Sequence, residues 1–146
     1  MYFAISLRKG IVYIPTMGKI DRGFYRGVEP VGVVAVSNTE ALRETIAAAI
    51  ARGNPSVPFL SRRDWPPPVV LKYAAVRSWS AFERGMMLWS IEKKDGSFQI
   101  ARQRKQIDGM WKDDPEHIVS CPSNALINEV VALIVTILQE ATRECY

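Results

Sequence analysis

Few residues in this chain have the type and spacing that catalysis requires. His117 is the only histidine, so a Ser-His-Asp or Cys-His arrangement would have to use it, and no Gly-x-Ser-x-Gly turn supplies a nucleophile. Its neighbours Pro115 and Glu116 indicate an exposed loop, where a solvated histidine is the commoner case. We therefore predict no catalytic residues and no enzymatic activity, although a nuclease built from lysine, arginine, aspartate and threonine would leave no motif.

Metal and cofactor binding are equally unsupported. Asp113, Asp114 and Glu116 carry the right oxygen ligands for a cation, but the spacing of an EF-hand loop is absent. One histidine with the distant Cys121 and Cys145 does not make a zinc site, and no glycine-rich phosphate-binding motif follows a strand. The sequence predicts no metal and no cofactor, and two free thiols in a reducing compartment.

Five cations gather around one predicted hairpin, which runs from Lys93 to Lys105. Such a ribbon can follow the phosphates of a nucleic acid, but charges on an exposed strand also protect a sheet edge from pairing. The chain has 19 Lys and Arg against 15 Asp and Glu, a net charge of +4 that discriminates poorly between these cases. Edge protection is the simplest interpretation, with nucleic-acid binding or a protein partner as alternatives. The five residues are Lys93, Lys94, Arg102, Arg104 and Lys105.

Two tryptophans stand beside carboxylates in predicted loops, where tryptophan is typical of interaction surfaces. Trp111 precedes the acidic run 113–116, and Trp65 follows Asp64 in a segment, residues 53–68, that holds five of the nine prolines. Prolines fix the backbone there, so we expect an extended surface connection that presents Trp65 at a low entropic cost. The plainer alternative is a rigid crossover whose Trp65 covers the edge of the core.

The elements that must position these residues predict an α+β fold. We expect a mainly antiparallel sheet of about five to seven strands with two principal helices packed on it. Ser-x-x-Glu boxes at Ser37 and Ser80 indicate two helix starts. The predicted elements are strands at 2–7 and 11–14, a central strand at 31–36, a helix to about Arg52, a hairpin at 89–102 around Asp95-Gly96, an edge strand at 106–111, an acidic loop at 113–116 and a last helix from Ser123 or Asn124 to about Arg143.

Length and composition predict one domain over residues 1–146. The chain is 48% hydrophobic and 23% charged, which is ordinary for a globular protein. Its longest apolar run, Val130 to Leu138, is far shorter than the roughly 20 residues that span a bilayer. Residues 1–7 lack the basic region of a secretory signal. We expect a cytoplasmic protein without membrane contact, whose apolar last helix lies across a sheet or in a subunit interface.

Several short strings occur in a characteristic order along most of the chain. They are Val12-Tyr13-Ile14-Pro15-Thr16, Glu29-Pro30-Val31, Gly53-Asn54-Pro55, Val70-Leu71-Lys72-Tyr73, Ser78-Trp79-Ser80-Ala81-Phe82-Glu83-Arg84 and Trp89-Ser90-Ile91-Glu92. In this layout the chain resembles bacterial immunity proteins of contact-dependent growth inhibition systems. The resemblance implies a cytoplasmic protein that binds and neutralises the C-terminal domain of a cognate toxin, often a nuclease, and has no catalytic residues of its own.

This resemblance makes the acidic residues candidates for partner binding. Immunity proteins that face basic nucleases tend to be acidic, whereas this chain is net basic, so either the toxin surface is acidic or a local acidic patch does the binding. A nucleic-acid-binding module that uses the hairpin and a homo-oligomer joined by its last helix are the other hypotheses. The candidate patch residues are Trp111, Asp113, Asp114 and Glu116, followed by Asp64 and Trp65.

Overall fold

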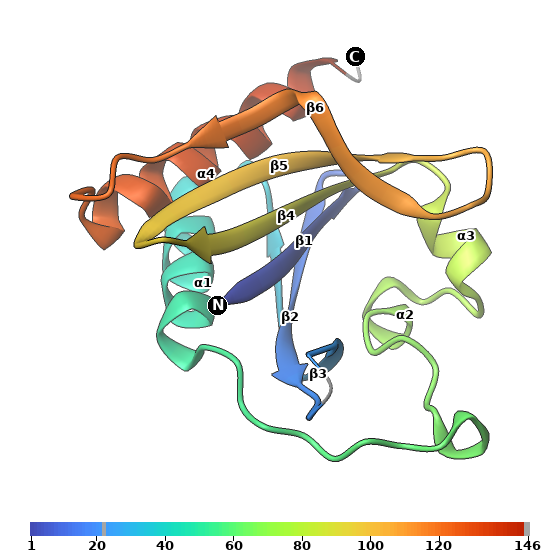
Figure 1. Ribbon diagram of the computed structural model, residues 1–146. Coiled ribbons are helices and arrows are strands. Elements are labelled where there is room, and N and C mark those ends of the chain that lie inside the picture. Colours follow the sequence, from blue (N-terminus) through green and yellow to red (C-terminus); the bar gives the residue numbers. More distant parts are fainter. Residues whose placement is uncertain (22, 145–146) are drawn as a thin grey trace.

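A six-stranded antiparallel sheet forms the centre of the computed structural model, which describes residues 1–21 and 23–144 (Figure 1). The strand order is β3-β2-β1-β4-β5-β6, so two three-stranded meanders meet where β1 pairs with β4. The predicted α+β class and mainly antiparallel sheet are confirmed. The strands are β1 (Tyr2–Arg8), β2 (Ile11–Lys19), β3 (Tyr25–Ala35), β4 (Met86–Lys94), β5 (Ser97–Lys105) and β6 (Trp111–Ser120).

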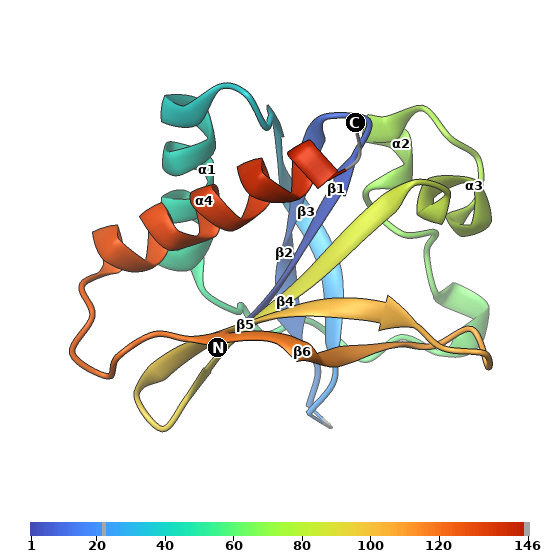
Figure 2. The same cartoon turned by 90° about the horizontal axis from the view of Figure 1, so that it is seen from above.

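Two long helices, α1 (Thr39–Arg52) and α4 (Ile127–Glu144), cover one face of the sheet (Figure 2). Each presents an apolar stripe at helical spacing, and the two stripes meet the inward side chains of β1, β2, β4 and β5 in the main core. The last helix thus lies across the sheet, which is one of the two positions that its apolar composition predicted. Its buried residues are Val130, Val131, Ile134, Val135, Leu138 and Ala141.

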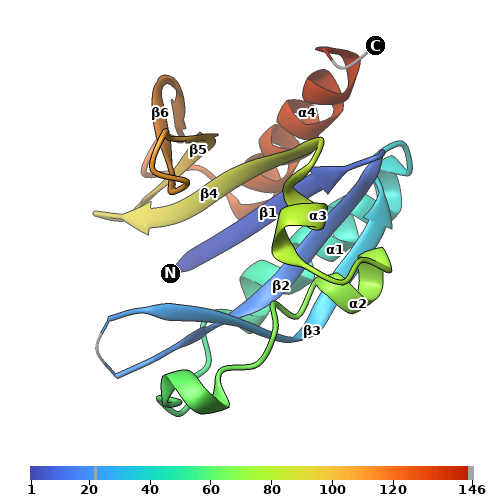
Figure 3. The same cartoon turned by 90° about the vertical axis from the view of Figure 1, so that its right-hand side faces the viewer.

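The opposite face of the sheet carries the segment that joins α1 to β4 (Figure 3). This crossover contains the 3-10 turn η1 (Arg62–Asp64) and two short helices, α2 (Leu71–Ala74) and α3 (Trp79–Glu83). Phe82 is fully buried in a second apolar cluster, with its ring centroid 5.4 Å from those of Tyr13 and Trp79. The crossover therefore forms a real layer of the fold, held by aromatic packing.

Both predicted capping boxes are displaced from the true helix starts. Asn38, not Ser37, caps α1, where its side-chain oxygen accepts the Ala41 N–H at 3.2 Å. Ser78, not Ser80, caps α3 and accepts the Ala81 N–H at 3.1 Å. The Ser-x-x-Glu spacing located both helix starts to within two residues. Any nearby polar side chain with suitable backbone angles can accept the same backbone N–H bond.

Two strand predictions were wrong. The apolar run 31–36 is not a central strand, because its residues up to Ala35 belong to β3, which pairs only with β2. The run is apolar because α1 and the crossover each cover part of it. Residues 106–110 make the turn before β6 and are not an edge strand. The acidic run 113–116 lies inside β6 and is not a separate loop between elements.

Candidate partner-binding surface

The structure separates the six predicted partner-binding residues into three places. Trp111 and Asp113 lie near the start of β6, on the sheet face that the crossover partly covers. Asp114 and Glu116 lie in an irregular part of the same strand. Asp64 and Trp65 lie in the crossover, at and just after η1.

Trp111 is a packing residue at the start of β6. Its half-buried ring joins the second apolar cluster, and its indole N–H donates to Glu83 Oε2 at 2.9 Å. Lys105 Nζ lies 2.7 Å from the other oxygen of the same carboxylate. Lys105 first and Trp111 second hold the pKa of Glu83 below its ordinary value. The bonds of Trp111 therefore point into the protein, toward α3.

Asp113 keeps one carboxylate oxygen free on an exposed surface. Its Oδ1 accepts hydrogen bonds from Ser90 Oγ at 2.8 Å and Gln103 Nε2 at 3.0 Å. No Lys, Arg or His of the described residues forms an ion pair with it. Burial raises the pKa of the Tyr2 phenol, and the charges of Asp113 and Glu92 raise it further. The carboxylates of Asp113 and Glu92 thus both act on the Tyr2 phenol.

Asp114 and Glu116 occupy a bulge in β6. The pairing with β5 passes from Ala101↔Ile118 to Gln103↔Asp113, which leaves residues 114–117 outside the regular register. The Glu116 backbone N–H, at 3.1 Å, and then His117 Nδ1, at 2.8 Å, lower the pKa of the Asp114 carboxyl. Glu116 and His117 line a shallow cleft of about 240 Å³ between β6 and α4. The charge of Asp114 is therefore satisfied within the bulge.

Trp65 lines a groove between the crossover and the sheet. Its side chain is 47% exposed, and the Arg26 guanidinium carbon lies 5.9 Å from its ring centroid. Asp64 accepts a hydrogen bond from Ser61 Oγ at 3.0 Å and faces solvent. The groove has a volume of about 450 Å³. Its apolar lining includes Met17, Tyr25, Trp65, Pro66, Trp79 and Leu88.

The sequence indicated the side of this groove that contains Trp65 and the prolines. It did not indicate the side that the strands form. Met17 and Tyr25 come from β2 and β3, and Leu88 comes from β4. In the sequence, Leu88 belongs to an ordinary strand pattern, and only the fold of the crossover over the sheet makes it part of a groove wall. No local signal in the sequence indicates that arrangement.

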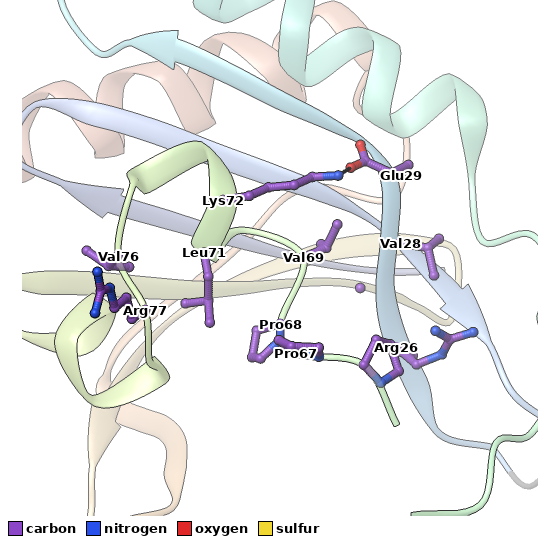
Figure 4. A pocket seen from close by; sticks show the side chains of 12 residues that line it. Arg26, Val28, Glu29, Pro67, Pro68, Val69, Leu71, Lys72, Val76 and Arg77 are labelled. Atoms are coloured by element: carbon purple, nitrogen blue, oxygen red, sulfur yellow. Dashed lines mark ion pairs between the residues drawn. The ribbon is translucent and has the colours of Figure 1, made fainter. Parts of the chain in front are cut away.

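A second cavity is lined by the same proline run (Figure 4). It measures about 540 Å³, and Lys72 of α2 reaches across it to form an ion pair with Glu29 of β3. Tyr73 Oη donates to the same carboxylate at 2.6 Å. Lys72 first and Tyr73 second hold the pKa of Glu29 below its ordinary value. These bonds tie the crossover to the edge of the sheet.

The five cations of the predicted hairpin do not form one cluster. Lys94 is next to the β4–β5 turn and Lys105 is at the far end of β5, eight residues and about 26 Å from Ser97 beside that turn. Lys94, Arg102 and Lys105 form ion pairs with Glu92, Glu144 and Glu83. Most of the basic ribbon is therefore neutralised by the protein's own carboxylates.

The described residues contain no metal site, one free thiol and no membrane-spanning helix. No group of three or more His, Cys, Asp or Glu in the described residues could hold a metal ion. Cys121 is a buried free thiol, and burial raises its pKa, whereas Cys145 lies outside the described residues. No helix in residues 1–21 and 23–144 has the length and apolar content to cross a membrane.

The fold recurs in proteins of little sequence similarity. A Neisseria meningitidis protein of unknown function has a TM-score of 0.65 and 14% identity, over 96% of this chain and 93% of that one. A chain of a CdiA-CT/CdiI toxin and immunity complex from Yersinia pseudotuberculosis has a TM-score of 0.62 and 11% identity, over 93% of this chain and 94% of that one. No family model and no curated protein matches the sequence.

Proposed function

We propose that this chain is a cytoplasmic immunity protein that binds and neutralises the toxin domain of a contact-dependent growth inhibition system. The observation that carries the proposal is the likeness to a chain of a toxin and immunity complex along nearly the full length of both chains. The order of short strings in the sequence led to the same expectation, and no family model or curated protein matches the chain. The toxin is expected to be a nuclease, as in many systems of this type.

The chain acts in this proposal by covering a surface of the toxin. Among the six candidate residues, Asp113 has one carboxylate oxygen that no hydrogen bond or ion pair of the described residues uses, and Trp65 has an exposed ring. Exposed tryptophan rings are typical of the residues that dominate binding energy at interfaces. An exposed carboxylate without a cationic partner among the described residues would let a net basic chain bind a cation of a basic nuclease.

The test is binding and protection with the toxin encoded beside this gene. The C-terminal domain of the large protein encoded directly upstream is purified alone and mixed with the full chain, and the complex is followed by size-exclusion chromatography and calorimetry. We expect a 1:1 complex, loss of toxin activity on nucleic acid, and normal growth of cells that express both proteins. A toxin domain of unrelated sequence serves as the control. Neither binding nor protection with the neighbouring toxin would overturn the proposal.

A further inference from the structure

Strand register and one hydrogen bond connect the floor of the Trp65 groove with Asp113. Ala4 of β1 lines the groove and is the register partner of Ser90 in β4. Ser90 is one strand spacing away, about 4.8 Å, and its hydroxyl donates to Asp113 at 2.8 Å. Asp113 is outside the lining of the groove, beyond its β4 side, and a long side chain that lies along the groove can extend toward it.

Charge differs between the crossover end of the groove and the region beyond its β4 side. Arg26 lies over Trp65 at the crossover end, so a second cation is repelled from that end. Beyond the β4 side, Asp113 has a free oxygen and no cationic partner in the described part of the chain. Between them, the walls of Leu88, Trp79 and Met17 are apolar. A ligand with an apolar stem and a cationic tip matches this arrangement, and lysine and arginine have that shape.

We propose that the groove receives a lysine or arginine side chain of the toxin domain, with its aliphatic stem between Trp65 and Leu88 and its charged end on Asp113. This inference rests on the proposed function and specifies the chemistry of its interface. Ser90 and Gln103 hold Oδ1 of Asp113 in place, so the free Oδ2 is preorganised for the incoming cation. The chemistry suits a basic nuclease surface, whose cations otherwise face nucleic acid.

The decisive variant is Asp113→Asn. The amide oxygen of asparagine can still accept from Ser90 and Gln103, so the fold is kept while the charge is removed. The matched control is Asp95→Asn, which removes one negative charge at the β4–β5 turn, where Asp95 has φ +51°, a conformation that asparagine tolerates well. By calorimetry with the upstream-encoded toxin domain, we expect Asp113→Asn to raise Kd about 10- to 100-fold and Asp95→Asn to change it less than about twofold.

A double-mutant cycle identifies the cation. Each exposed Lys and Arg of the toxin domain is changed to Ala and measured against both the wild-type chain and Asp113→Asn. We expect one toxin variant whose loss of affinity largely disappears in the Asp113→Asn background. Trp65→Ala should lower the affinity for that toxin variant less than it lowers the affinity for the wild-type toxin domain. The toxin variant already lacks the side-chain stem that would contact Trp65.

The outcomes separate the inference from the proposed function. If the wild-type chain binds the toxin domain and Asp113→Asn binds it equally well, the inference is wrong and the immunity function stands. The inference is also wrong if no toxin cation couples to Asp113. If the wild-type chain does not bind the upstream toxin domain, the proposed function itself fails. The melting temperature of each variant is compared with that of the wild type, so that a loss of affinity caused by unfolding is recognised.

Discussion

At the scale of single residues, two neighbouring carboxylates of β6 have different bonding partners. Asp113 and Asp114 are adjacent and identical in type, yet one keeps a free oxygen and the other is satisfied by Glu116 and His117. The difference comes from the bulge in β6, which depends on pairing with β5 and has no local signature. Glu83 is a similar case, because its expected capping role is replaced by bonds to two distant residues.

Glu83 offers a direct test of these residue-level bonds. Glu83→Ala leaves the Trp111 indole N–H and Lys105 without their acceptor in a largely covered position, since only 12% of the Glu83 side chain is exposed. We expect a loss of about 1–3 kcal/mol in the free energy of unfolding, measured by urea denaturation at neutral pH. Glu83→Gln should lose less, because its amide oxygen can still accept from Trp111. Equal stability of the alanine variant and the wild type would contradict this account.

The same carboxylate predicts a pH dependence. The pKa of Glu83 is lowered in the folded state from its ordinary value of 4.5. A group of this kind stabilises the fold fully above its unfolded-state pKa, and the contribution is lost as the pH falls through the folded-state pKa. The stability difference between the wild type and Glu83→Ala should therefore be constant from pH 7 to about 5.5 and shrink below 4.5. A difference that persists unchanged to pH 3 would show that the charge is not involved.

At the scale of elements, the periodicity of apolar residues predicted the type of the main elements and about how many strands there are. It did not predict the position of each strand in the sheet. The run 31–36 is apolar enough for a central strand, but it lies in β3, at an edge that α1 and the crossover both approach. A strand with both faces covered has the same apolar pattern in the sequence whether it is central or at an edge of the sheet. Gly32 marks the close approach of α1: a Cβ there would collide with Thr45 Cγ2. A glycine inside a strand is a signal of such contact.

The close approach of Gly32 and Thr45 predicts that a change at one position can compensate for a change at the other. Gly32→Ala should lower the free energy of unfolding by about 1–3 kcal/mol, because Thr45 is β-branched and its hydroxyl is bonded to Ala41 O at 2.7 Å, so the side chain cannot turn away without losing that bond. Thr45→Ser removes the colliding methyl group and keeps the hydroxyl. We expect the double variant to recover most of the loss in chemical denaturation. Purely additive effects would mean that the strain at Gly32 has another source.

At the scale of the whole molecule, the sheet has one face covered by long helices and one covered by the crossover. The helices and the main core followed from the sequence, because their apolar stripes are regular. The second layer did not, because α2 and α3 have only four and five residues and the crossover is held by scattered aromatics such as Phe82. The candidate groove lies at this second layer, which explains why the sequence revealed only one of its walls.

This architecture predicts an uneven distribution of local stability, which hydrogen exchange can measure. β1 and β4 are hydrogen-bonded to a strand on each side and lie at the centre of the sheet, so their amides should exchange only through global unfolding. Residues 61–65 of the crossover are exposed, and Asp64 N–H bonds only locally, to Ser61 O at 3.0 Å, so this turn can open without disturbing the sheet. We expect its amides to exchange at least about 1,000-fold faster than those of β4.

The same measurement with the toxin domain connects local stability to the groove. If a toxin side chain lies against Trp65, opening of residues 61–65 requires its release, so exchange of this segment should slow on binding while β4, already protected, changes little. Peptides from the β4–β5 turn around Asp95, which is remote from the groove residues in the sheet, serve as an internal control. Slowed exchange at the turn with none at residues 61–65 would place the toxin on a different surface.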